Sequence, residues 1–147
     1  MKINKFYESI ADYYDYIFDP EDSAEVINEL YLNSKPGRII DIGCATGKLS
    51  AGLADMNHEV TAIDLDSKMV TTAEEKYRQK GAKLKFMRKD MLEIDKAFEA
   101  GYFDAAVCVG NTIVHLEGYE KIKEFFGALN KILKPGAVFI AQILNYD

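Results

Sequence analysis

The stretch Arg38–Ser50, RIIDIGCATGKLS, decides how the rest of the chain can be interpreted. An apolar run ends at Asp41, and two glycines follow at Gly43 and Gly47 before a helical pattern begins. Glycine has no Cβ atom, so it lets a backbone turn tightly and approach a ligand closely. The N-terminus of a helix favours an anion such as a carboxylate. The stretch therefore predicts a buried strand, a ligand-binding loop and a helix, with Asp41 ordering the loop or meeting a cationic ligand group.

Hydrophobic periodicity outside this stretch predicts strands and helices that alternate along the chain. Such alternation is typical of one α/β domain in which helices cover both faces of a parallel sheet. The predicted strands cover 38–41, 59–64, 82–87, 103–110 and 137–144, and the predicted helices cover 4–18, 22–32, 47–56, 67–80 and 119–133. Two KPG triplets are predicted to break the chain, at 35–37 and at 134–136.

The composition restricts the function classes that fit this chain. A length of 147 residues suggests one domain, and a hydrophobic content of 48% is enough to build a core. The formal net charge of −6 argues against nucleic acid as a partner, because such proteins usually present a clustered basic face. Since no apolar run reaches about 18 residues, we expect no membrane span and a cytoplasmic location. Two cysteines and two histidines, all scattered, predict neither a disulfide framework nor a metal site.

Polar residues follow the second, third and fourth predicted strands. The carboxyl ends of parallel strands meet at one edge of a sheet, where ligands bind in folds of this class. Asp64 is placed to bind both hydroxyls of a ribose, and Asp90 could accept a hydrogen bond from an exocyclic amine while the Met91 N–H contacts a ring nitrogen. Gly110 and Asn111 form a polar turn at the same edge. Any one aspartate could be only a helix cap, but the set together predicts a nucleoside site.

The chain also resembles a known family, the class I S-adenosylmethionine-dependent methyltransferases. IIDIGCATGKLS is similar to their first motif, whose usual form is (D/E)xGxGxG, and four later segments are similar to their strand motifs in the same order. The five segments are 39–50, 60–70, 86–94, 103–116 and 129–140. The resemblance implies a three-layer αβα Rossmann-like fold with a mostly parallel sheet. It divides the single domain 1–147 into N-terminal lid helices at 1–34 and a core at 38–147.

The sequence departs from the family pattern at two places. Ala45 stands where the middle glycine of the first motif is usual, which is a mild change if the φ angle of Ala45 is negative. The chain ends at Asp147, where the family continues with a helix and an antiparallel strand pair. We therefore expect a sheet that lacks the final antiparallel strands. Either the chain is shortened, or another chain covers its last strand, and a homo-oligomer formed through that edge is one such arrangement.

The resemblance implies methyl transfer to a small-molecule acceptor, with S-adenosylmethionine as cofactor and S-adenosylhomocysteine as product. Leu65 would stack on the adenine, and Tyr14 would close over the cofactor. His115 is the candidate for acid–base catalysis, although it could equally order its loop or line the pocket. The implied cofactor-binding residues are Tyr14, Asp41, Gly43, Cys44, Ala45, Gly47, Asp64, Leu65, Asp90, Met91, Gly110 and Asn111.

Within the family, CVGNTIVHL at 108–116 and LNYD at 144–147 look most like glycine and sarcosine N-methyltransferases. Two other functions remain open. One is an NAD(P)-dependent oxidoreductase, which the loop spacing disfavours because a pyrophosphate needs GxGxxG. The other is a non-catalytic or incomplete fragment that binds the cofactor without turnover.

Overall fold

The computed structural model describes residues 8, 10–13 and 23–144. The strands are β1 Arg38–Ile42, β2 Glu59–Asp64, β3 Leu84–Arg88, β4 Phe103–Cys108 and β5 Leu133–Ala141. The α-helices are α3 Ser23–Leu30, α4 Lys48–Asp55, α5 Ser67–Lys76, α6 Ile94–Ala97 and α7 Tyr119–Ile132. Short 3-10 helices are η1 Ala11–Tyr13, η2 Arg78–Lys83, η3 Met91–Glu93 and η4 Ile113–His115.

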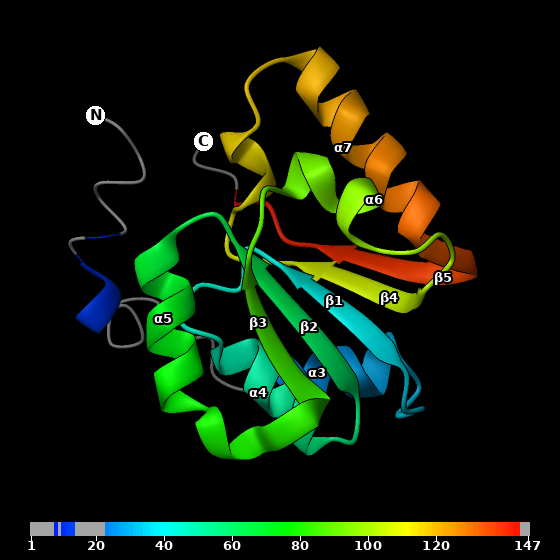
Figure 1. Cartoon of the computed structure of the whole chain (residues 1–147). Helices are drawn as coiled ribbons and strands as arrows, with labels where there is room; N and C mark the ends of the chain where they lie inside the picture. The colour runs from blue at the N-terminus through cyan, green and yellow to red at the C-terminus, as the bar shows by residue number, and fades with distance from the viewer. Residues whose placement is uncertain (1–7, 9, 14–22, 145–147) are drawn as a thin grey trace.

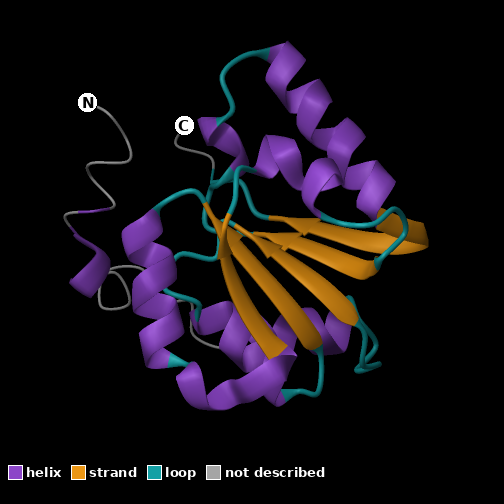
Figure 2. Cartoon of the chain, viewed as in Figure 1, coloured by secondary structure: helices purple, strands orange, loops and turns teal. Residues whose placement is uncertain are grey.

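The five strands form one sheet in the order β3-β2-β1-β4-β5, and every neighbouring pair is parallel. Helices α3, α4 and α5 lie on one face of the sheet, and α6 and α7 cover the other face (Figures 1 and 2). The predicted three-layer α/β fold is thereby confirmed. The strand order reverses between β1 and β4, so the carboxyl ends of these two strands open a crevice.

The core is divided into two layers by the sheet, because successive side chains of a strand point to opposite faces. Ile39 packs in the layer beneath α4, where Leu53 is fully buried. Ile40 packs in the opposite layer, where Phe103 of β4 and Phe125 of α7 are fully buried. A central strand that is apolar on both faces fits the uninterrupted apolar run read from the sequence.

Several element boundaries differ from the predictions. The helix predicted to run to 80 ends at Lys76, and η2 continues the chain to Gly81, whose φ of 66° breaks the helical geometry. Strand β5 begins at Leu133 rather than after the second KPG, because a register shift against β4 between Phe103 and Ala105 absorbs that triplet. The short helices η3 and α6 were not predicted, since four residues are too few to show a helical period.

Helix α3, which belongs to the segment 1–34 predicted as lid helices, packs against α4 on the sheet. A Cβ atom on Gly52 would lie 2.6 Å from the Cβ of Ala24, so that glycine lets the two helices approach closely. Buried His58 fixes α3 further, because its Nε2 lies 2.7 Å from Asn28 Oδ1 while its Nδ1 accepts from the Gly37 N–H. None of the helices in the described ranges is both long and apolar enough to cross a membrane.

Candidate functional site

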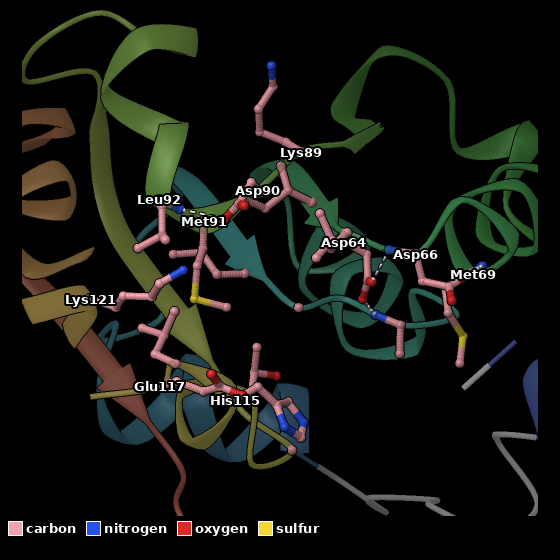
Figure 3. A pocket seen from close by; sticks show the side chains of 18 residues that line it. Asp64, Asp66, Met69, Lys89, Asp90, Met91, Leu92, His115, Glu117 and Lys121 are labelled. Atoms are coloured by element: carbon pink, nitrogen blue, oxygen red, sulfur yellow. Dashed lines mark hydrogen bonds between the residues drawn. The ribbon is translucent and has the colours of Figure 1, made fainter. Parts of the chain in front are cut away.

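A cavity of about 310 Å³ opens at the carboxyl ends of the strands, at the crevice between β1 and β4. The loops after β1, β2, β3 and β4 and the first turn of α7 all contribute to its lining. Figure 3 shows Asp64 and Asp66 on one side of the cavity, Met91 and Lys121 on another, and His115 and Glu117 together at a third. The predicted ligand-binding edge of the sheet therefore does contain a pocket.

Asp64 joins two loops of the cavity at the end of β2. Its Oδ2 accepts a hydrogen bond of 2.9 Å from the Ala45 N–H, and its Oδ1 accepts one of 2.9 Å from the Asp66 N–H. Burial raises the pKa of the Asp64 carboxyl above its usual range, although these backbone bonds oppose the shift. Each oxygen keeps a second lone pair, so the carboxylate can still accept from a ligand hydroxyl.

The two glycines of the first loop are required by the protein's own packing. Both have left-handed backbones, with φ of 77° at Gly43 and 82° at Gly47. A Cβ atom on Gly43 would lie 2.4 Å from Thr112 Oγ1, and one on Gly47 would lie 2.5 Å from the Phe86 ring. Ala45 also has a positive φ, of 48°, so its replacement of the usual glycine is not the mild change expected for a negative angle. The loop keeps a left-handed alanine at a conformational cost.

The N–H groups of this loop already have partners within the protein. Those of Gly43 and Cys44 donate to the Ile63 carbonyl, and that of Gly47 donates to the Cys44 carbonyl. The Ala45 N–H donates to Asp64. These four amides are therefore engaged within the protein and are not available to hold a ligand carboxylate.

Asp41 lies beneath the loop and is not part of the cavity lining. It is fully buried, and its carboxylate accepts a hydrogen bond from the Ser50 hydroxyl. Burial raises the pKa of Asp41 to about 7, and the nearby Asp64 adds to the shift while Ser50 opposes it. Cys44 is buried as well, and burial raises the pKa of its thiol. Asp41 is therefore placed to order the loop, the first of the two roles that the sequence suggested.

Two other aspartates of the cavity, Asp66 and Asp90, act as helix caps. Asp66 caps α5, accepting from the Lys68 and Met69 N–H groups, and Asp90 caps η3, accepting from the Leu92 N–H. The second oxygen of Asp66 is buried and has no partner among the described residues. Asp66 and Asp90 are thus helix caps in the structure. Asp90 also lines the cavity.

The predicted site residues fall into three groups. Those that line the cavity are Gly43, Ala45, Asp64, Leu65, Asp90, Met91, Gly110 and His115. Those that lie outside the lining are Asp41, Cys44, Gly47 and Asn111. Tyr14 lies outside the described residues.

Sequence reasoning missed several residues that line the cavity, among them Lys89, Glu117 and Lys121. Lys89 follows β3 directly and could have been found by reading one residue further back from Asp90. Glu117 lies just before α7 and Lys121 lies in its first turn, and the helical pattern carries no sign of which turn meets a ligand. In the described part of the chain no group of three or more metal-ligating side chains occurs.

The comparisons with known proteins agree with this geometry. The family described as methyltransferase domain matches residues 39–136. A Bacillus subtilis protein named as methyltransferase YqeM is 33% identical over 93% of this chain and 55% of its own length. Glycine/sarcosine N-methyltransferase of Halorhodospira halochloris is 27% identical over 97% of this chain and 54% of its own length. The chain thus spans about half the length of these curated relatives.

Solved structures give the same result. An S-adenosylmethionine-dependent methyltransferase from Clostridium acetobutylicum superposes with a TM-score of 0.76 at 26% identity, covering 97% of this chain and 58% of that one. A structure from Methanococcus maripaludis superposes with a TM-score of 0.77 at 23% identity, covering 94% of this chain and 63% of that one. The second likeness supports the fold alone.

Proposed function

This chain belongs to the methyltransferase domain family, and from that premise we propose that it binds S-adenosylmethionine in the cavity and transfers the methyl group to a small-molecule acceptor. The observation that carries the proposal is Asp64. Its carboxylate lines the cavity at the end of β2, beside a glycine loop that follows β1. A carboxylate in that position of a Rossmann-like sheet is suited to bind ribose hydroxyls.

The residues present fit this cofactor. A volume of about 310 Å³ is at the low end of ligand pockets, which hold roughly 300–1,000 Å³. Leu65 and Met91 offer apolar contact for an adenine, and Asp90 stands beside them. The Gly43, Cys44, Ala45 and Gly47 amides are engaged within the protein, so this part of the loop would contact the ligand through other groups.

When bound, S-adenosylmethionine supplies a methyl group already activated on a sulfonium sulfur. The chain then has to bind the cofactor, orient the acceptor and exclude water. Each task can be assigned to particular residues. Asp64 would hold the ribose hydroxyls, and Asp90 and Met91 would hold the adenine. Gly43 and Ala45 would border the methionine half. His115, which lines the cavity, would take the proton of an acceptor that arrives protonated.

A small-molecule acceptor is supported by the relatives' names and by charge. Two relatives are named glycine/sarcosine N-methyltransferase and one is named glycine N-methyltransferase, from Rattus norvegicus. The net charge of −6 disfavours a nucleic-acid acceptor. Glycine and sarcosine are therefore the first acceptors to try.

The test is calorimetric titration of the chain with S-adenosylmethionine, S-adenosylhomocysteine and NAD in parallel. We expect the first two to bind in the micromolar range and NAD to show no heat of binding. Tight binding of NAD with neither of the others would replace the proposal by the oxidoreductase alternative. A methyl-transfer assay with glycine and sarcosine follows.

A second candidate is a cofactor-binding fragment that needs more chain to act. It is favoured by one observation, the coverage of only about half of the curated relatives. Binding of S-adenosylhomocysteine without turnover, and turnover in a longer chain, would support this candidate over a complete enzyme.

A further inference from the structure

The turn that follows β4 is tied to the segment that follows β5 by two reciprocal amide contacts. The Gln142 side chain accepts a hydrogen bond of 3.1 Å from the Gly110 N–H through its Oε1. The Asn111 side chain in turn accepts one of 3.1 Å from the Leu144 N–H through its Oδ1. A backbone bond from the Gln142 N–H to the Cys108 carbonyl closes the same connection. Each segment thus satisfies a backbone donor of the other.

The other side of this turn presses on the glycine loop after β1. The Thr112 side chain occupies the space where Gly43 would carry a Cβ, with Oγ1 at 2.4 Å and Cγ2 at 2.5 Å from that position. The Thr112 hydroxyl donates to the Val109 carbonyl over 3.0 Å, which fixes its rotamer. Gly43 and Thr112 both line the cavity. Any displacement of the turn therefore reaches the glycine loop directly.

The turn also has an unusual backbone that needs external support. Gly110 and Asn111 are both left-handed, with φ of 72° and 66°. A left-handed conformation is unfavourable for a residue with a Cβ, less so for asparagine, and such geometry persists where neighbouring contacts hold it. The contacts from Gln142 and Leu144 are those supports.

We propose that Asn111, Thr112 and Gln142 are positioning residues that couple the segment after β5 to the glycine loop, so that this segment sets the affinity for the methionine half of the cofactor. The inference rests on the proposed function. Binding of the nucleoside half should not depend on the segment after β5, because the carboxylates at that end of the cavity are held by other hydrogen bonds. Asp64 is held by the Asp66 amide and Asp90 by the Leu92 amide, and neither amide belongs to the glycine loop.

The variants are chosen as pairs that differ in one property. Gln142→Met removes the acceptor for the Gly110 N–H, whereas Gln142→Glu keeps a carboxylate oxygen in its place. Asn111→Gly keeps the left-handed backbone and removes the acceptor for the Leu144 N–H, whereas Asn111→Asp keeps both. The probes are S-adenosylhomocysteine, which carries both halves, and adenosine, which carries only the nucleoside half.

We expect Gln142→Met and Asn111→Gly to weaken S-adenosylhomocysteine binding by roughly two- to tenfold, the range for one lost hydrogen bond. Adenosine binding should stay unchanged, and both control variants should bind both probes as the parent chain does. Equal losses for adenosine and S-adenosylhomocysteine would overturn the inference, since a merely structural defect would affect both. Unchanged S-adenosylhomocysteine binding in both acceptor-deleting variants would overturn it as well.

A ligand-free measurement separates the coupling from the proposed function. Amide hydrogen exchange at Gly43 and Cys44 should be faster in Gln142→Met than in Gln142→Glu, because the turn that supports the loop is loosened. If exchange responds and no variant, including the parent chain, binds S-adenosylhomocysteine, the coupling stands and the proposed function fails. If exchange does not respond, the coupling fails whatever the binding shows.

Discussion

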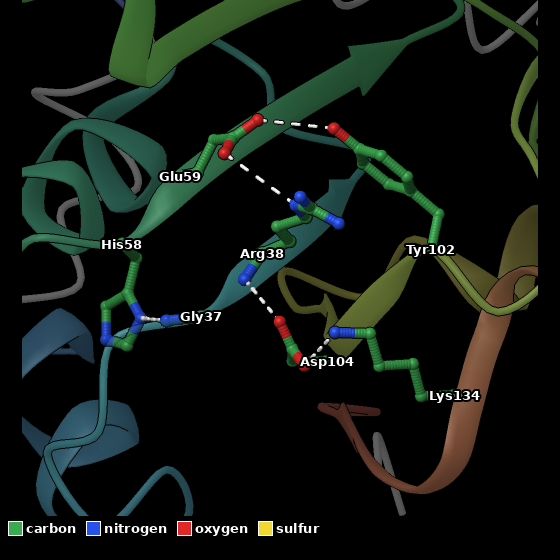
Figure 4. Close-up of polar contacts among 7 residues, drawn as sticks. All are labelled: Gly37, Arg38, His58, Glu59, Tyr102, Asp104 and Lys134. Atoms are coloured by element: carbon green, nitrogen blue, oxygen red, sulfur yellow. Dashed lines mark hydrogen bonds and ion pairs between the residues drawn. The ribbon is translucent and has the colours of Figure 1, made fainter.

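Carboxylates at the two ends of the sheet have different kinds of partner. At the amino end, Asp104 accepts from the Arg38 N–H at 2.8 Å and from Lys134 Nζ at 2.6 Å, and Glu59 pairs with Arg38 at 3.8 Å (Figure 4). At the carboxyl end, Asp41 is buried and Asp64 is half-buried, and their carboxylates accept hydrogen bonds from a serine hydroxyl and from backbone amides, respectively.

This difference separates carboxylates that are paired with a cation from carboxylates whose hydrogen bonds come from neutral groups. A paired carboxylate near the surface loses little solvation, whereas a buried carboxylate without a cation has its charged form disfavoured. The pKa of Asp41 is accordingly raised to about 7 by burial, and that of Asp64 is raised by the same cause. A cationic ligand at the carboxyl end would relieve part of that cost.

The largest expected effect is that of Gly43→Val. A Cβ there collides with Thr112, and valine is strained at a φ of 77°. We expect S-adenosylhomocysteine binding to fall at least about 100-fold, or two tenfold steps. Gly101→Val is the matched control, because Gly101 has a φ of 63° and open space around it. Equal loss of binding in both variants would show that backbone strain alone, and not the loop contact, is responsible.

Asp64→Ala tests the comparison directly when set beside Asp104→Ala. Removal of Asp64 deletes the carboxylate that we assign to the ribose, so S-adenosylmethionine affinity should fall more than about tenfold, or 1.4 kcal/mol. Removal of Asp104 should leave the affinity unchanged, since that residue lies at the opposite end of the sheet. Titration calorimetry of the two variants measures both values. Unchanged affinity in Asp64→Ala would remove that residue from the site.

Asp41→Asn should change how stability depends on pH. In the parent chain the folded state holds Asp41 protonated up to a pKa of about 7, while the unfolded state ionises near 3.8. Raising the pH through that window therefore favours unfolding, and asparagine removes the effect while keeping the Ser50 contact.

We expect the unfolding free energy of Asp41→Asn, minus that of the parent chain, to increase between pH 5 and pH 8. The increase should be at least about 1.4 kcal/mol, the equivalent of one pKa unit. Urea denaturation at both pH values gives the result. An advantage that stays constant with pH would show that Asp41 ionises normally in the folded chain.

The smallest expected effect is that of Lys134→Met, at the amino end of the sheet. The Lys134 and Asp104 side chains are each 41% exposed, so their ion pair is screened by solvent. We expect a loss of about 0.2–1 kcal/mol in unfolding free energy, which shrinks further as salt is added. A salt-independent loss would mean that the packing of the lysine stem matters more than its charge.

Much of the fold could be predicted because its signals are local. The apolar run of β4 and the helical spacing of α7 each specify an element without knowledge of its neighbours. Boundaries were less certain where tertiary contacts decide them. The start of β5 at Leu133 depends on a register shift against β4, which no local pattern encodes.

The site residues that could be predicted are those that lie at or directly after the ends of strands. Asp64 and Asp90 were found because the carboxyl ends of parallel strands meet at one edge. The reason for Gly43 could not be read from the sequence, since Thr112 lies far from it along the chain and meets it only in the fold. The positive φ of Ala45 was likewise invisible, because an alanine carries no sign of a left-handed backbone. Asn111 sits outside the cavity lining because its side chain is engaged with Leu144.

The way the cavity is assembled has a thermodynamic consequence. Its lining draws on the ends of β1, β2, β3 and β4, and β1 meets β4 through pairs as distant along the chain as Ile39 and Ala105. A molecule bound there acts as a reversible cross-link between four strands. Its binding energy would be distributed over the whole sheet, raising the unfolding free energy by about 2.7 kcal/mol at a hundredfold excess over Kd. The melting temperature of this chain should then rise with the free concentration of the bound molecule.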